Sequence, residues 1–154
     1  MATTLVAAPE TVSVTESFTI NGTAKNSTNT YTVNTITQDD VRTMTVPSAS
    51  EISILDIAAA GTALGPGKLL GTAIKYLRIS NKDDTNFVRI GVKTTGGDTF
   101  YLKCPPGAIL IFPVMEYDVN ILGLAFVAYG FPDTIVAQAD AAPVQIEYRI
   151  FQTG

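Results

Sequence analysis

The residue types that most often carry chemistry are sparse in this chain. It has 154 residues, no histidine and a single cysteine, Cys104. The missing histidine excludes Ser–His triads, histidine zinc sites and a histidine general base. A lone cysteine cannot form an internal disulfide and offers no metal-ligand spacing. Because no histidine can activate it, we interpret Cys104 as a core or rim residue rather than a nucleophile.

Carboxylates are the remaining candidates for chemistry. Glu116 and Asp118 in "MEYDVN" would suit only a carboxylate mechanism of the glycosidase kind, and a solvated loop is the simpler interpretation. Asn81, Asp83 and Asp84 offer oxygen ligands for calcium, but their segment lacks the length and the glycine of an EF-hand loop.

Glycines also gather in "GTALGPGKLLG", residues 61–71. This stretch lacks the spacing and the Lys-Ser/Thr ending of a phosphate-binding loop. The sequence therefore predicts no enzyme, no metal ion and no cofactor.

Two arginines suggest interface chemistry instead. The segment "YLRISNKDDTNFVRIGVK", residues 76–93, predicts a β-hairpin whose apolar residues match in a register that places Arg78 opposite Arg89. Like charges in such a position are destabilising by up to about 1 kcal/mol. Two interpretations stay open. The side chains extend into water or reach Asp83 and Asp84, or an acidic surface of another chain completes the face.

The charge distribution supports an interface. Lys68 to Lys103 contains seven basic and three acidic residues, whereas the rest of the chain has three basic and eleven acidic ones. Complementary potentials of this kind orient partners. The net charge of −4 argues against nucleic acid, which needs a basic surface. The residues that we predict at a protein interface are Arg78, Arg89, Lys93, Leu5 and Val6.

The elements that position these residues are predicted to be short strands. Alternating Val, Ile and Thr, interrupted by Gly and Pro at short intervals, favour an all-β fold, and long helical stripes are missing. We predict one domain over residues 1–154, a two-sheet antiparallel sandwich (jelly roll) of about eight strands. Strands are expected at 11–20, 30–36, 41–47, 76–80, 87–93, 100–102, 108–113 and 143–152, a polar turn or loop at 21–30, and a strand or short helix at 51–58.

Residues 1–10 are predicted to form a short extended arm, with Leu5 and Val6 as its apolar points. This stretch has no basic n-region and too short an apolar run for a signal peptide. The most apolar stretch, Val119 to Phe131, is too short to span a bilayer. We expect no membrane partner, and synthesis and assembly in a cytoplasm.

The segment "KYLRISNKDDTNFVRIGVKTTGGDTFYLKCPPGAILIFP", with "APVQIEYRIFQ" near the end, resembles the core of small virion proteins of tailed bacteriophages. The shared features are a strand ending in "ISN", an acidic turn, a second strand and a "PPG" corner before an apolar strand. Jelly-roll capsid decoration (cement) proteins are the family it resembles most. The resemblance covers about a third of the chain, Lys75 to Pro113 and the C-terminal strand.

This resemblance implies a homotrimer that binds the outside of a capsid shell and clamps the junctions between capsomers. Its partners would be the major capsid protein and further copies of itself, with no cofactor. The implied location is the capsid surface of a virion assembled in the host cytoplasm.

A glycan- or receptor-binding jelly-roll module of a phage tail or fibre is the alternative. Such a module needs an aromatic platform, and the chain has no tryptophan. Tyr101, Tyr117 and Tyr129 are the residues whose exposure would favour it.

Overall fold

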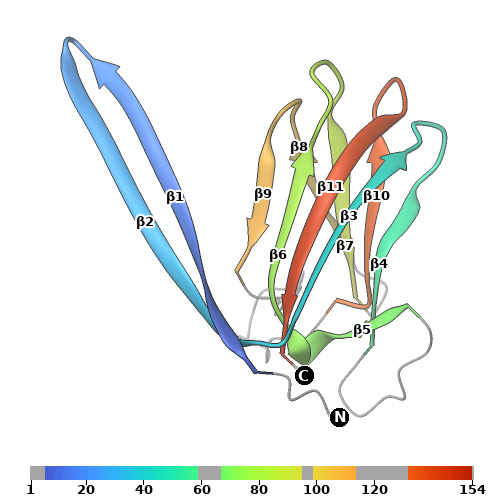
Figure 1. Ribbon diagram of the computed structural model, residues 1–154. Coiled ribbons are helices and arrows are strands. Elements are labelled where there is room, and N and C mark those ends of the chain that lie inside the picture. The colour runs from blue at the N-terminus through green and yellow to red at the C-terminus, as the bar shows by residue number, and fades with distance from the viewer. Residues whose placement is uncertain (1–5, 59–66, 95–98, 114–131, 154) are drawn as a thin grey trace, which may run out of the picture.

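The chain forms two β-sheets packed face to face, from which a long β-hairpin projects (Figure 1). The computed structural model describes residues 6–58, 67–94, 99–113 and 132–153. Its strands are β1 (Ala8–Ile20), β2 (Thr23–Ile36), β3 (Gln38–Val46), β4 (Ile52–Ala58), β5 (Lys68–Leu70), β6 (Ile74–Asn81), β7 (Val88–Lys93), β8 (Thr99–Cys104), β9 (Ile109–Phe112), β10 (Thr134–Ala139) and β11 (Val144–Gln152). The predicted all-β, two-sheet fold is confirmed.

The strand order defines the topology. The four-stranded sheet has the order β3-β11-β6-β9 and the five-stranded sheet the order β5-β4-β10-β7-β8. Pairing in both sheets is antiparallel, except that the short β5 lies parallel to β4. If β5 is left aside, consecutive strands from β3 to β11 lie in opposite sheets, except β7 and β8, which are neighbours in one sheet. This is the connectivity of a jelly roll.

The core lies between the two sheets and follows the alternation of the strands. Val144, Ile146, Tyr148 and Ile150 of β11 point inward, as the sequence predicts, and each is buried. Burial of one such aliphatic side chain contributes about 1.5–3 kcal/mol. Residues 51–58, for which strand and helix were both open, form the strand β4.

The predicted hairpin at residues 76–93 is wrong. Strand β6 pairs with β11 and β9, whereas β7 pairs with β10 and β8 in the other sheet. The predicted facing of Arg78 and Arg89 therefore does not occur. Ile79 of β6 and Val88 of β7 do share one core, but they enter it from opposite sheets. A matching apolar pattern cannot distinguish pairing within a sheet from packing across a sandwich.

Asn81 builds the corner that carries the chain from β6 to the other sheet. Its side chain is buried, and Nδ2 donates hydrogen bonds to the carbonyl oxygens of Asn86 (2.9 Å), Cys104 (3.2 Å) and Pro105 (3.0 Å). Its Oδ1 accepts the backbone N–H of Asp83 at 3.0 Å. One side chain thus ties together both ends of the crossing.

The projecting hairpin consists of β1 and β2 joined by Asn21 and Gly22. Both turn residues have positive φ (49° and 78°), which fits the type I′ turn that two-residue hairpins prefer. At about 3.4 Å per residue the ribbon is about 40 Å long. Of the turn or loop predicted at 21–30, the turn is present at Asn21 and Gly22, but a loop over the whole stretch is wrong, because β2 already begins at Thr23. What projects is residues 8–36, a much longer segment than the predicted ten-residue arm.

The root of the hairpin is tightly held. Thr37 alone separates β2 from β3, and the carbonyl oxygen of Gln152 accepts its backbone N–H (2.9 Å) and its hydroxyl (3.4 Å). Thr35 has φ +58°, a conformation that costs a β-branched residue about 1–3 kcal/mol. Such a residue persists only where its surroundings hold it, so the root sets the direction in which the ribbon leaves the sandwich.

Candidate interaction surfaces

The hairpin has two chemically different faces. Directly opposite residues share a face of an antiparallel ribbon, and successive residues alternate. One face carries only small, mostly polar side chains: Thr11, Ser13, Thr15, Ser17, Thr19, Ala24, Asn26, Thr28, Thr30 and Thr32. The other, the apolar hairpin face, carries Val12, Val14, Phe18, Ile20, Tyr31 and Val33, with six polar or charged residues between them: Glu10, Glu16, Thr23, Lys25, Ser27 and Asn29.

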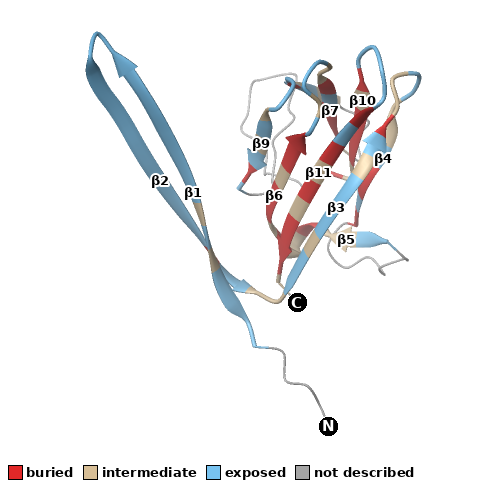
Figure 2. Cartoon of the chain, turned by 45° about the horizontal axis from the view of Figure 1, so that its top comes forward, coloured by how far each residue is buried: buried red, intermediate tan, exposed pale blue. Residues whose placement is uncertain are grey.

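Most of the apolar hairpin face is uncovered (Figure 2). Val14, Phe18, Ile20 and Tyr31 are 45%, 50%, 54% and 44% exposed. An isolated two-stranded ribbon is only marginally stable in water. Sequestering this face would therefore stabilise the hairpin as well as remove apolar surface from water.

The outer face of the four-stranded sheet carries exposed apolar residues on its two edge strands, with arginines on the two strands between them. The strand register places Val41, Arg149, Arg78 and Ile111 side by side across its four strands. Val41 and Ile111 at the two ends of this row are exposed, as is Ile109 next to it on β9. Nine large apolar side chains are exposed among the described residues, and seven belong to this outer face or to the apolar hairpin face.

The arginines of this outer face are held by carboxylates. Arg149 forms a two-pronged pair with Asp39 (Nε–Oδ1 3.0 Å, Nη2–Oδ2 2.7 Å), which raises the pKa of the guanidinium. Arg78 Nη2 donates to Glu147 Oε1 at 2.5 Å. The Nε of Arg78 is buried without a hydrogen-bond partner among the described residues. Arg78 thus does have an arginine beside it, but that arginine is Arg149 of β11.

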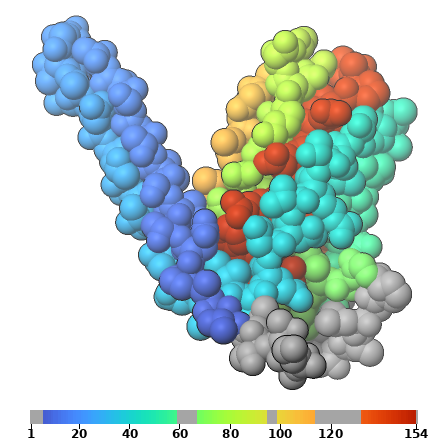
Figure 3. Space-filling model, viewed as in Figure 1, coloured from blue at the N-terminus to red at the C-terminus, as the bar shows by residue number. Residues whose placement is uncertain are grey.

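Among the described residues, the hairpin contacts the sandwich near its root, where Tyr31 Oη also donates to the carbonyl oxygen of Pro113 at 3.4 Å. Val12, Val33 and Ile36 of the hairpin pack against Tyr76 of β6 and Phe151 of β11, whose rings stack with centroids 5.0 Å apart. We call this contact the seam. Beyond it the ribbon and the sandwich diverge, as the space-filling view shows (Figure 3).

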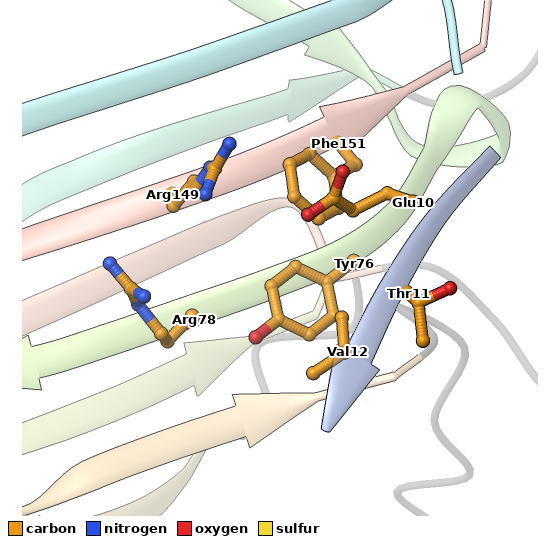
Figure 4. Close-up of a pocket in the computed structure, with 7 residues that line it drawn as sticks. All are labelled: Glu10, Thr11, Val12, Tyr76, Arg78, Arg149 and Phe151. Carbon is orange, nitrogen blue, oxygen red and sulfur yellow. The ribbon is translucent and has the colours of Figure 1, made fainter. Parts of the chain in front are cut away.

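A pocket of about 160 Å³ opens beside the seam (Figure 4). Glu10 of the apolar hairpin face lines it together with the guanidinium groups of Arg78 and Arg149. The charge of Glu10 contributes to the raised pKa of Arg149. At the seam, the apolar hairpin face and the outer face of the four-stranded sheet therefore meet through apolar contacts and through opposite charges. Towards the tip of the hairpin the same two faces are exposed.

The outer face of the five-stranded sheet is chemically separate. Arg89 and Lys93 both pair with Glu51, Arg89 at 3.7 Å. The hydrogen bond from Lys93 lowers the pKa of Glu51, and the same bond raises that of Lys93. Tyr101, 45% exposed, lies across Gly91, where an added Cβ would stand 2.6 Å from its ring. The Arg89 guanidinium carbon lies 4.3 Å from the ring centroid.

The structure groups only some of the predicted interface residues. Glu51 brings Arg89 and Lys93 together, while Arg78 lies on the other sheet's outer face. Val6, just before β1, is 79% exposed, and Leu5 lies outside the described residues. Four of the cations in the basic stretch, Arg78, Lys82, Arg89 and Lys93, share two carboxylates from elsewhere in the chain, Glu147 and Glu51.

The described residues that were candidates for catalysis and metal binding are buried in the core or hydrogen-bonded within the chain. Cys104 is buried in the core, as expected, and burial raises the pKa of its thiol. The Asp83 carboxylate accepts backbone N–H groups of Asn86 and Thr85, which lower its pKa. Among the described residues, no group of three or more His, Cys, Asp or Glu side chains could hold a metal ion. Glu116 and Asp118 lie outside the described residues.

Two further observations concern the size of the pockets and the hydropathy of the helices. Three pockets lined by described residues measure about 160, 230 and 170 Å³, below the roughly 300–1,000 Å³ of most small-molecule sites. Within the described part of the chain, no helix has the length and apolar character needed to cross a membrane.

Sequence reasoning missed the exposed residues of the hairpin, Val14, Phe18, Ile20 and Tyr31. The signal was present in Asn21-Gly22, a dipeptide typical of type I′ turns between alternating strands. The polar residues that follow it concealed the second strand, since a ribbon with one solvated face needs few apolar side chains.

Comparison of the chain with protein-family models, curated proteins and solved structures found no match in any of the three. The case for a function therefore depends on the surfaces described above and on the partial resemblance of residues 75–113.

Proposed function

We propose that this protein is a structural subunit that binds other protein subunits, and specifically a decoration (cement) protein on the outside of a phage capsid. The observation that carries the proposal is the apolar hairpin face, which the protein's own described residues cover at the root only. The resemblance of residues 75–113 suggests the kind of particle, and makes the major capsid protein the partner. The work would be mechanical, holding capsomers together at their junctions.

Physical chemistry supports adhesion through such a ribbon. Each Å² of apolar surface removed from water contributes about 25 cal/mol. The hydrogen bond from the Thr37 N–H to the Gln152 carbonyl oxygen anchors the root of the ribbon to the sandwich. If several copies associate, the assembly meets the shell at several linked sites. Linked sites of this kind gain about 10²–10⁴ in avidity without any new contact.

The test is binding to shells of the phage that encodes the chain, purified without this protein. We expect saturable co-sedimentation with the shells, presence of the protein in mature virions by mass spectrometry, and shells that resist heat better when it is bound. Virions that lack the protein, or shells that leave it in the supernatant, would refute the proposal.

A glycan-binding module of a phage tail or fibre is the second candidate, favoured by one observation. Tyr101 lies flat over Gly91 with 45% of its surface exposed, and Arg89 and Glu51 offer polar groups beside it. Aromatic rings in such positions stack on sugars. Tyr117 and Tyr129, the other tyrosines considered, lie outside the described residues.

A glycan array decides between the two functions. The module predicts a hit that Tyr101→Ala abolishes, with Tyr31→Ala on the hairpin as the control that retains it. A blank array together with shell binding supports the decoration protein.

A further inference from the structure

We infer that the apolar hairpin face of one copy packs on the outer face of the four-stranded sheet of a second copy. This inference rests on the proposed structural function and names a partner for the hairpin. The hairpin would contribute Val14, Phe18 and Ile20, and the sheet would receive them beside Val41 and Ile111.

The seam is the first reason, because it already joins these two faces. Val12 and Val33 of the hairpin contact Tyr76 and Phe151 of the sheet within one chain. Val14, Phe18 and Ile20 continue the same hairpin face, since they follow Val12 at even spacings. On the sheet, the row of Arg149 and Arg78 comes next to that of Phe151 and Tyr76. A neighbour's hairpin would extend a contact that exists.

The root is the second reason, and it favours another copy over the chain's own hairpin. Thr37 is the only residue between β2 and β3, and Gln152 binds both its N–H and its hydroxyl. With the root fixed, the ribbon diverges from its own sheet and leaves the sheet's outer face open (Figure 3). Both complementary surfaces are present on every copy, but one copy cannot bring them together over their length.

Charge is the third reason. Glu10 of the hairpin already lies at the pocket lined by Arg78 and Arg149. Glu16, six residues later, lies on the same hairpin face. A neighbour's Glu16 would bring a further carboxylate to these guanidinium groups, which pair with Glu147 and Asp39 within the chain.

The contact joins two different surfaces, so it is heterologous. Repeated contacts of this type either close into a ring or continue as a filament. A ring fits a discrete particle component, and three copies are the number that the resemblance implies. Every hairpin would then be covered by the next copy.

The first experiment measures the mass of the purified chain by light scattering, up to its solubility limit. Phe18→Asp places a charge on the apolar hairpin face, and Thr19→Asp places the same charge on the polar face one residue away. We expect wild type and Thr19→Asp to form a trimer and Phe18→Asp to show a roughly threefold lower mass. Circular dichroism and thermal unfolding establish that both variants are folded.

The second experiment tests the partner surface by mixing. Ile111→Asp disrupts the sheet face and leaves the hairpin intact, whereas Phe18→Asp does the reverse. Each variant alone should be monomeric. Mixed, they retain one intact contact, the hairpin of Ile111→Asp on the sheet of Phe18→Asp, so we expect a heterodimer. If Ile111→Asp does not fold, Val41→Asp at the other end of the row replaces it.

Several results would overturn the inference. A monomeric wild type would do so, as would an oligomer that neither variant weakens or a mixture that remains monomeric. A monomer whose hairpin amides are protected from hydrogen exchange would show that the ribbon closes on its own sheet. A monomer that binds shells refutes only this inference, whereas a trimer that ignores shells and is missing from virions refutes only the proposed function.

Discussion

The sandwich and the hairpin are both built from strands with alternating faces but differ in what covers those faces. In the sandwich, each apolar face meets the apolar face of the other sheet, and residues such as Ile79 and Ile146 are fully buried. In the hairpin, the polar face meets water and the apolar face is covered only at the seam. Apolar and polar residues therefore alternate along the strands in both regions, but the apolar face packs against the other sheet in the sandwich and is mostly exposed in the hairpin.

This difference teaches where stability originates. The sandwich contains its partner surface within the chain, so its core residues should determine the unfolding of the protein. The hairpin's apolar surface is mostly outside the described core, so its residues should determine association instead. The predictions below test that division, beginning with the largest expected effect.

Ile79→Ala should destabilise the protein by about 2–5 kcal/mol, because it leaves a cavity between the sheets. Val14→Ala, a similar loss of apolar volume on the exposed hairpin face, should change the free energy of unfolding by less than about 0.5 kcal/mol. Urea unfolding of both variants measures the contrast, with Phe18→Asp added to each so that association does not contribute. Equal effects would mean that the hairpin belongs to the same cooperative core.

Asn81→Ala should cost about 1–3 kcal/mol, because three carbonyl oxygens lose their donor in a buried corner. Asp84→Ala, three residues away on the exposed side of the same corner, should have little effect. Thermal unfolding compares the two. Matching melting curves for Asn81→Ala and wild type would show that the corner is held by other contacts.

Much of the sandwich could be predicted from sequence because its strands have one buried face. The inward set Val144, Ile146, Tyr148 and Ile150 was predictable from alternation, and so were the buried positions of Val88, Ile90 and Val92. What alternation cannot supply is which sheet receives each strand. At the crossing from β6 to β7, the Asn81 Nδ2 lies within hydrogen-bond distance of three carbonyl oxygens, from residues that only the folded chain brings together.

The interface residues were less predictable for a related reason. Arg78, Arg89 and Lys93 stood out as charges, yet each finds a carboxylate from a distant part of the chain, Glu147 or Glu51. The exposed apolar residues of the hairpin were harder to predict. Whether they are exposed depends on which other strands cover them, and their own segment does not contain that information.

Tyr76→Leu should loosen the seam by about 0.5–1.5 kcal/mol, the contribution of an aromatic pair, because it removes the ring that stacks on Phe151. Hydrogen exchange at the Thr37 amide should accelerate up to roughly tenfold, while amides of β7 in the sandwich stay unchanged. Tyr76→Phe keeps the ring and is the control. Faster exchange throughout the sandwich would show that seam and core unfold together.

Glu51→Gln should have the smallest effect, at most about 1 kcal/mol at neutral pH, since it removes ion pairs near the surface. The folded protein lowers the pKa of Glu51 from 4.5, chiefly through Lys93, so the ionised carboxyl stabilises the fold. That contribution is present in full above pH 4.5 and is lost as the pH falls through the lower folded pKa. The difference in unfolding free energy between wild type and Glu51→Gln should therefore shrink below pH 4.5. If the difference in unfolding free energy persists in acid, the effect of Glu51→Gln comes from packing of the side chain and not from its charge. In that case Glu51→Gln should have the same effect in a Lys93→Met background, which lacks the ion-pair partner.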